Sequence, residues 1–131
     1  MRKKVFGRKL NRNRRSRSAL FKAQMKSMIL HGKIKTTKAK ALALNPELDR
    51  LIGLVKKNDL AAHRAALATL GNDRKATDML FEKYVALADS RNSGFTSMAL
   101  LENRKGDDAD MVSISWVELP AEKKEEKKEE K

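Results

Sequence analysis

Positively charged side chains are concentrated at the start of this chain. Residues 1–40 contain fifteen Lys and Arg and no Asp or Glu, residues 41–120 contain ten basic and twelve acidic residues, and residues 121–131 contain five of each. Fifteen like charges in so short a segment repel one another unless a polyanion neutralises them. The chemistry that this distribution predicts is phosphate binding, with nucleic acid as the partner.

Arginine dominates the centre of the basic segment, between residues 8 and 17. A guanidinium binds phosphate through two parallel hydrogen bonds, whereas a lysine ammonium acts as a point charge. Asn and Ser side chains between the arginines can reach sugar hydroxyls or base edges, and Gly7 allows close approach of the backbone. Phe6 is the only aromatic residue before residue 18, so stacking on single-stranded bases is not the main mode of binding. These features favour a folded nucleic acid that is bound through its backbone and shape.

The sequence contains little that could carry catalysis. It has two histidines, His31 at the end of a predicted helix and His63 on the apolar side of another, and it has no cysteine. We expect His63 to be a partly buried structural residue, and the sequence lacks the common phosphate-loop, zinc and nucleophile motifs. Asp107, Asp108 and Asp110 lack the periodic spacing of calcium ligands, so a solvated turn is expected there. We predict a protein without enzymatic activity, cofactor, metal or small-molecule substrate.

Length and composition indicate one globular domain. The chain has 131 residues, of which 36% are charged, above the roughly 25% of an average protein. The longest apolar run, residues 84–88, is too short for a membrane-spanning helix or a signal core. Residues 1–30 are Arg-rich and acid-free, as in a mitochondrial transit peptide, but the arginines are too dense to leave an apolar helical face. We expect a cytoplasmic protein that does not contact membranes.

The elements that would position the cations begin near Ser16. Residues 2–15 have no hydrophobic periodicity, so we expect an extension that is disordered in isolation and ordered on a phosphate surface. From a cap at Ser16 or Ser18, apolar residues recur at helical spacing up to His31-Gly32, where glycine is expected to end a helix of about fourteen residues. The following segment, 33–37, is rich in β-branched residues and is consistent with either a short strand or a plain loop.

Three further helices are expected. The second begins at Lys38 and contains Pro46, which removes a backbone donor, so we expect a kink or two abutting segments. The third spans residues 60–70 and is capped by the Asn-Asp pair before it. The fourth spans residues 72–90. Its inner face comprises Leu80, Phe81, Tyr84, Leu87 and Ala88.

A hairpin is expected near the C-terminus. Residues 95–103 and 111–119 have the composition of strands, and the loop between them contains Gly and Asp. Val112, Ile114 and Trp116 alternate with serines, which predicts that they share the buried face of a strand.

The C-terminal tail is expected to be disordered. After Pro120, Glu and Lys alternate with a period of four residues, so i,i+4 pairs join like charges and weaken a helix. We therefore divide the chain into a basic RNA-binding extension (1–17), a globular α+β domain (18–120) and a disordered Glu/Lys tail (121–131).

Several blocks of residues together resemble one known family. Two of them, Gly-Arg-x-Leu-Asn-Arg from Gly7 and Ile-Lys-Thr-Thr from Ile34, are specific in this order. The other matching residues are Met1-Arg2, Phe6, Asn13, Arg17, Ala19-Leu20-Phe21, His31, Leu51-Ile52, Leu54, Arg91, Gly94-Phe95-Thr96, Arg104, Gly106-Asp107 and Glu118-Leu119. Over residues 1–119 the chain is similar to the bacterial large-subunit ribosomal protein numbered seventeen.

The resemblance implies an α-β-α-α-α-β-β fold in two layers, with helices packed on a small sheet, as the element order above also indicates. It also implies a structural protein that binds large-subunit ribosomal RNA near the outer end of the nascent-chain tunnel, beside neighbouring ribosomal proteins. The residues that we expect to bind RNA are Arg2, Lys3, Lys4, Gly7, Arg8, Lys9, Asn11, Arg12, Asn13, Arg14, Arg15, Arg17, Lys22, Lys35, Thr36, Thr37, Lys38 and Lys40.

The chain departs from the family pattern at three places. Where the family usually has Ser-Ser-His-Arg, residues 14–17 are Arg-Arg-Ser-Arg, so a His contact is lost and two charges are gained. Lys38-Ala39 replaces Leu-Pro, which removes a preset first helical turn. Ser97 replaces an Arg, which places an RNA role for that strand in doubt.

Two other classes of function remain open. A DNA-compacting or regulatory protein would need a recognition helix with a basic face, but the third and fourth predicted helices are nearly neutral. Membrane-surface binding would use the helix at residues 18–31, which has Lys22 and Lys26 but no Trp, while the denser charge lies outside it. Ribosomal RNA binding is therefore the favoured interpretation.

Overall fold

The structure of the chain, a computed structural model, describes residues 7–117. Within this range the elements are α1 (Arg14–His31), β1 (Lys33–Thr37), α2 (Lys38–Lys57), α3 (Leu60–Thr69), α4 (Arg74–Lys83), α5 (Val85–Ser90), β2 (Thr96–Leu100) and β3 (Met111–Trp116). The expected disorder of the tail, the end of the second hairpin strand and the contacts of Arg2, Lys3 and Lys4 lie outside the described residues.

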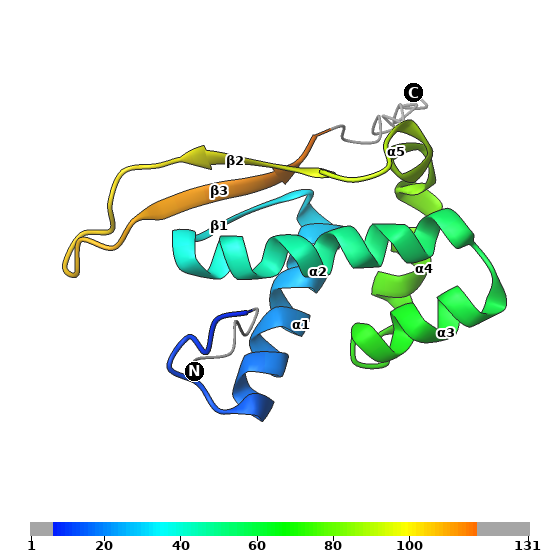
Figure 1. Cartoon of the computed structure of the whole chain (residues 1–131), viewed down its shortest axis with the longest axis horizontal. Coiled ribbons are helices and arrows are strands. Elements are labelled where there is room, and N and C mark those ends of the chain that lie inside the picture. The colour runs from blue at the N-terminus through cyan, green and yellow to red at the C-terminus, as the bar shows by residue number, and fades with distance from the viewer. Residues whose placement is uncertain (1–6, 118–131) are drawn as a thin grey trace, which may run out of the picture.

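The three strands form one antiparallel sheet in the order β1-β3-β2. The hairpin predicted near the C-terminus is confirmed as β2 and β3, and segment 33–37 is a strand rather than a loop. Figure 1 shows the strands as one layer with the helices on one side of it, and α2 running along the sheet. The predicted α+β fold in two layers is therefore confirmed.

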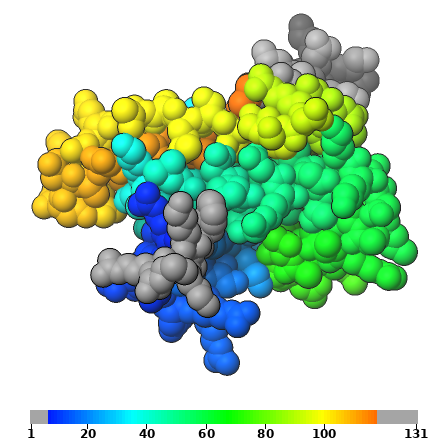
Figure 2. Space-filling model, viewed as in Figure 1, coloured from blue at the N-terminus to red at the C-terminus, as the bar shows by residue number. Residues whose placement is uncertain are grey.

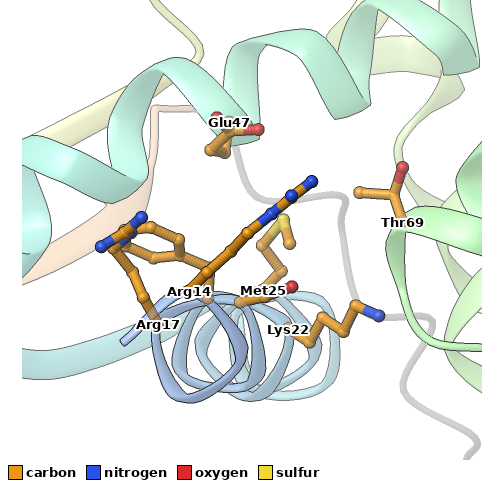
Figure 3. A pocket seen from close by; sticks show the side chains of 8 residues that line it. Arg14, Arg17, Lys22, Met25, Glu47 and Thr69 are labelled. Atoms are coloured by element: carbon orange, nitrogen blue, oxygen red, sulfur yellow. The ribbon is translucent and has the colours of Figure 1, made fainter. Parts of the chain in front are cut away.

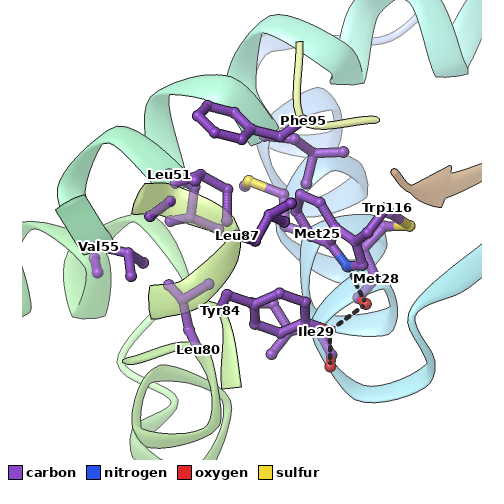
Figure 4. Close-up of a cluster of buried hydrophobic side chains, with 14 of the residues drawn as sticks. Met25, Met28, Ile29, Leu51, Val55, Leu80, Tyr84, Leu87, Phe95 and Trp116 are labelled. Carbon is purple, nitrogen blue, oxygen red and sulfur yellow. Dashed lines mark hydrogen bonds between the residues drawn. The ribbon is translucent and has the colours of Figure 1, made fainter. Parts of the chain in front are cut away.

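The core lies between the helices and the inner face of the sheet. Val112, Ile114 and Trp116 are buried, as the alternating pattern predicted. Ile114 and Trp116 belong to one core cluster with buried side chains from α1, α2, α4 and α5, among them Leu51 and Leu80 (Figure 4). The alternate residues of β3 point to the other face of the sheet. Only one face of this central strand therefore packs against the helices.

Helix α1 begins earlier than the sequence predicted. Asn13, not Ser16 or Ser18, caps the helix, because its side-chain oxygen accepts a hydrogen bond from the backbone N–H of Ser16 at 2.8 Å. The prediction at the other end is correct: Gly32 adopts a left-handed conformation with φ 73°, and its N–H donates to the carbonyl of Met28. The helix is therefore 18 residues long, and its first turn is formed by arginines.

Pro46 does not divide α2 into two segments, contrary to one of the expected outcomes. The helix continues from Lys38 to Lys57 as one element of 20 residues (Figure 1). Pro46 lacks the N–H that would bond to the carbonyl of Leu42, but both residues are exposed, so water can satisfy that carbonyl.

The fourth predicted helix is in fact two, α4 and α5, which meet at Tyr84. Tyr84 has φ −105° and ψ 8°, outside helical geometry, and its hydroxyl donates to the carbonyl of Ile29 at 2.9 Å. The break lets α4 pack on α1 while α5 packs on α2. The five residues predicted for the inner face are all buried, although no local signal marks the bend.

Candidate nucleic-acid interface

A turn before α1 folds the N-terminal segment back onto the domain. The N–H of Arg12 donates to the carbonyl of Lys9 at 3.1 Å, and the two residues between them have φ values of 53° and 50°. Left-handed geometry suits Asn11, whose short side chain tolerates it. As a result Arg8 lines one groove with Lys38, at the start of α2.

The first turns of α1 carry the densest group of cations. Arg14, Ser18 and Lys22 follow one another at i,i+4 spacing and so share one side of the helix. Arg14, Arg17 and Lys22 line a cleft between α1, α2 and α3 (Figure 3). Arg15 lies on the neighbouring side, where it lines a second, shallow groove together with Arg14 and Lys22.

We call the cations of the N-terminal segment, of the first half of α1 and of the start of α2 the basic surface. Figure 2 shows the blue N-terminal residues below the cyan start of α2, with the lighter blue residues next to the green part of the chain. The basic surface comprises Arg8, Lys9, Arg12, Arg14, Arg15, Arg17, Lys22, Lys38 and Lys40.

The basic surface is not neutralised by the protein itself. In the part of the chain that the structure describes, the first forty residues contribute twelve Lys and Arg, and Lys26 is the one among them that forms an ion pair. Its ammonium lies 3.1 Å from the carboxylate of Asp73 on the turn before α4. Hydrogen bonds from the Ala76 N–H and from Lys26 hold the pKa of Asp73 below its usual value. The remaining cations are available to an external anion.

Strand β1 presents its cations on a different side of the molecule. Lys35 is exposed on the face of the sheet opposite the helices. Lys33, two positions earlier and also exposed, lies on the same face but was not among the predicted site residues. Thr36 points the other way and is 7% exposed, and its hydroxyl accepts a hydrogen bond from Gln24 at 2.9 Å. Thr36 therefore has a structural position, and we leave it out of the proposed interface. Thr37 is half-buried and directly precedes α2, but its side chain makes no capping hydrogen bond to that helix.

Two other predicted site residues have a conformational role in the free protein. Asn13 caps α1, so its side-chain oxygen is occupied, and Gly7 has φ 103°, which favours glycine. Arg17 is partly held as well, because its guanidinium donates to the carbonyl of Arg12 at 3.3 Å. These contacts shape the segment that carries the basic surface.

The remaining charged features have structural explanations. Asp107 pairs with Arg104 in the hairpin loop at 2.6 Å, and this guanidinium lowers the pKa of Asp107 to about 2. His63 is half-buried, as expected, and its ring stacks on Phe81 with centroids 3.6 Å apart. Within residues 7–117 no group of three His, Asp or Glu side chains could hold a metal ion. No helix in that range is long and apolar enough to cross a membrane.

Comparison with known proteins identifies the family of this chain. A family model described as ribosomal protein L17 matches residues 20–117. The chain belongs to the ribosomal protein L17 family. It is 41% identical over 121 residues to the large ribosomal subunit protein bL17 of Persephonella marina, covering 92% of this chain and 98% of that protein. Its identity to bL17 of Thermus thermophilus is 40% over 119 residues, covering 90% of this chain and 100% of that protein.

Family membership confirms the resemblance seen in the sequence and makes this chain a ribosomal protein. The family model begins at residue 20, after most of the basic surface, while the alignment to the Persephonella protein extends over 92% of the chain. Ser18, one of the interleaved serines expected to reach sugar or base, lines the same cleft as Arg14. The structure adds Glu47 and Thr69, which the sequence did not single out and which reach the cleft only through the packing of α2 and α3.

Proposed function

We propose that this protein is a structural constituent of the large ribosomal subunit that binds ribosomal RNA through the basic surface. The observation that carries the proposal is the unpaired charge of that surface, in a member of a ribosomal protein family. We further propose, from the family resemblance, a position near the outer end of the nascent-chain tunnel, beside other subunit proteins of the cytoplasmic ribosome. The protein would act by binding and shaping RNA, without catalysis.

The composition of the surface supports recognition of the RNA backbone and shape. Arginines supply paired donors for phosphates, and the surface offers few aromatic side chains on which bases could stack. Binding should release counterions, so the affinity should depend steeply on salt. If about eight of the fifteen cations in residues 1–40 reach phosphates, log K should fall with log salt at a slope of about −6 to −7.

The test is the salt dependence of binding to ribosomal RNA. Changing Arg8, Arg12, Arg14 and Arg17 to Ala should make the slope shallower by about 3 to 4 units. A matched variant removes four exposed cations elsewhere. It combines Lys57→Ala, Arg74→Ala, Lys75→Ala and Lys83→Ala.

The matched variant loses the same charge and should leave the slope nearly unchanged. An unchanged slope in the four-arginine variant, with its helix content intact by circular dichroism, would place the RNA interface elsewhere. Random duplex DNA and anionic vesicles at the same salt concentration serve as competitors. Ribosomal RNA should bind more tightly than either, because DNA and membranes offer negative charge without the recognised RNA shape.

A further inference from the structure

The cleft between α1, α2 and α3 collects groups of complementary kinds in one place. Arg14, Arg17 and Lys22 enter it from α1, Glu47 from α2 and Thr69 from α3, and its volume is about 300 Å³. Figure 3 shows Arg14 and Lys22 reaching across the cleft toward Thr69, with Glu47 on the opposite wall. The cleft therefore carries three positive charges and one negative charge.

We propose that this cleft is a seat for the sugar–phosphate backbone of a single RNA strand, and that it sets the register in which the protein docks. The inference rests on the proposed function and adds a defined site to it. Arg14 and Lys22 are two helical turns apart, about 12 Å along the axis. They therefore contact different phosphates of one strand, and Ser18 lies between them with a hydroxyl for the same strand.

Two of the three cations of the cleft, Lys22 and Arg17, are held by the fold before RNA arrives. The stem of Lys22 packs over Gly71, where a Cβ atom would come within 3.3 Å of Lys22 Cδ and 3.8 Å of its Nζ. Arg17 is restrained by its bond to the carbonyl of Arg12. Side chains that are already ordered lose less conformational freedom on binding, so each contact contributes more to affinity than a contact from a free surface side chain.

Glu47 determines which chemistry fits the cleft. Its carboxylate is 2.9 Å from the guanidinium of Arg50, which lies outside the cleft. No ion pair joins Glu47 to Arg14, Arg17 or Lys22 among the described residues. A phosphate in the cleft would be attracted by the three cations and weakly repelled by Glu47. A nucleobase with an amino group would instead use Glu47 as a hydrogen-bond acceptor.

Affinity measurements with matched variants distinguish a specific binding site in the cleft from general attraction between the basic surface and RNA. Arg14→Ala and Lys22→Ala each remove one cation of the cleft, and Arg15→Ala removes an exposed cation one residue away that does not line the cleft. At one salt concentration, each cleft variant should bind ribosomal RNA at least about tenfold more weakly, and Arg15→Ala about twofold to threefold. Equal losses of RNA affinity in all three variants would contradict a backbone-binding site in the cleft, but they would still be consistent with the proposed function.

Glu47→Gln tests the identity of the occupant. For an RNA backbone, this variant should bind RNA more tightly than the unmodified protein, and the gain should exceed that of Glu82→Gln, an exposed acid on α4. A loss of affinity for Glu47→Gln would mean that the carboxylate accepts a hydrogen bond from a base or a ribose hydroxyl. That outcome would overturn the phosphate assignment.

Directed hydroxyl-radical probing locates the strand in assembled large subunits. The chain contains no cysteine, so a single cysteine can carry a tethered iron–EDTA group. Thr69→Cys should direct cleavage to one short stretch of RNA, Lys9→Cys should cleave RNA at the basic surface, and Asp78→Cys on α4 should cleave little. Cleavage from position 9 without cleavage from position 69 would show that the cleft does not bind RNA and would contradict the proposed site. Absence of cleavage from both positions would overturn the proposed function itself.

Discussion

Two aromatic side chains satisfy the buried end of α1. The indole N–H of Trp116 donates to the carbonyl of Met28 at 3.1 Å, and the hydroxyl of Tyr84 donates to the carbonyl of Ile29 at 2.9 Å (Figure 4). Carbonyls near the end of a helix lack partners within it, so these two donors add to the Gly32 cap in stabilising the buried end of α1. Trp116 and Tyr84, whose ring centroids are 5.0 Å apart, thereby join the sheet and α4 to the helix that carries the basic surface.

Trp116→Ala should strongly destabilise the fold. Trp116 is 3% exposed, and its truncation should lower the free energy of unfolding by about 3–5 kcal/mol, measured by urea denaturation. Trp116→Phe keeps much of the packing and should cost less. Because this is the only Trp in the chain, its fluorescence gives a direct check. A red-shifted, quencher-accessible spectrum of the folded protein would contradict the buried position.

The phenol of Tyr84 should titrate above its ordinary pKa. Burial raises the pKa of Tyr84 above 10.0, because the phenolate would have to form away from water. A folded-state pKa above the unfolded value means that this contribution to stability is complete below pH 10 and is lost as the pH rises through the folded pKa. The chain has one Tyr, so tyrosinate absorbance reports it alone. Titration at the same pH in the folded protein and in urea would contradict the expectation.

At the scale of elements, α1 joins the basic surface to the core. Its first turns carry Arg14, Arg15 and Arg17, and its second half contributes Met28 and Ile29 to the core. The helix starts where it does because Asn13 supplies a cap that precedes the arginines. Helical geometry then holds those cations in fixed positions instead of leaving them on a flexible extension.

Asn13→Ala should fray the first turn of α1 without unfolding the domain. Loss of a cap costs about 1 kcal/mol, and the effect is local because the rest of the helix is held by the core. Hydrogen exchange at Ser16 and Arg17, whose amides bond to Asn13, should become faster in the free protein. Asn13→Ser keeps a capping oxygen and should restore most of the protection. Unchanged exchange in the Ala variant would show that the cap is dispensable.

At the scale of the whole molecule, charge and core are arranged on different parts of the chain. The basic surface comes from residues 8–40, and most of the buried side chains come from residues 41–116. The later helices and the hairpin carry charges of both signs, as in the Arg104–Asp107 pair. One side of the molecule can therefore bind a polyanion while the rest supplies the rigid support.

Deletion of residues 121–131 should leave RNA affinity within about twofold at physiological salt. These residues contain five Lys and five Glu, so the deletion does not change the net charge of +13. Binding of the segment would also cost about 1–2 kcal/mol per ordered residue, and it has no apolar side chain after Ala121 to offset that cost. Filter binding of the full-length and shortened proteins is the measurement. A tenfold loss would reveal a specific partner for the tail.

Local patterns in the sequence were sufficient for most elements of the fold. The glycine that ends α1, the Asp59 cap of α3 and the alternation in β3 were all predicted correctly. Each of these signals acts within a few residues, through backbone conformation, a capping bond or side-chain period. The charge of residues 1–40 likewise indicated the class of partner, because net charge does not depend on how the chain folds.

Other features were decided only by tertiary structure. Tyr84 interrupts a continuous helical pattern because of contacts with distant parts of the chain. Its hydroxyl bonds to Ile29, and the two helices on either side of it, α4 and α5, pack on α1 and α2 respectively. Thr36 is buried because Gln24 lies 12 positions earlier on a helix that packs against its strand. The cleft that contains Glu47 and Thr69 exists because α2 and α3 pack beside the first turns of α1. Contacts between residues far apart in sequence leave no periodic or compositional trace, so the sequence determined which cations the chain carries, and the packing determined where they lie.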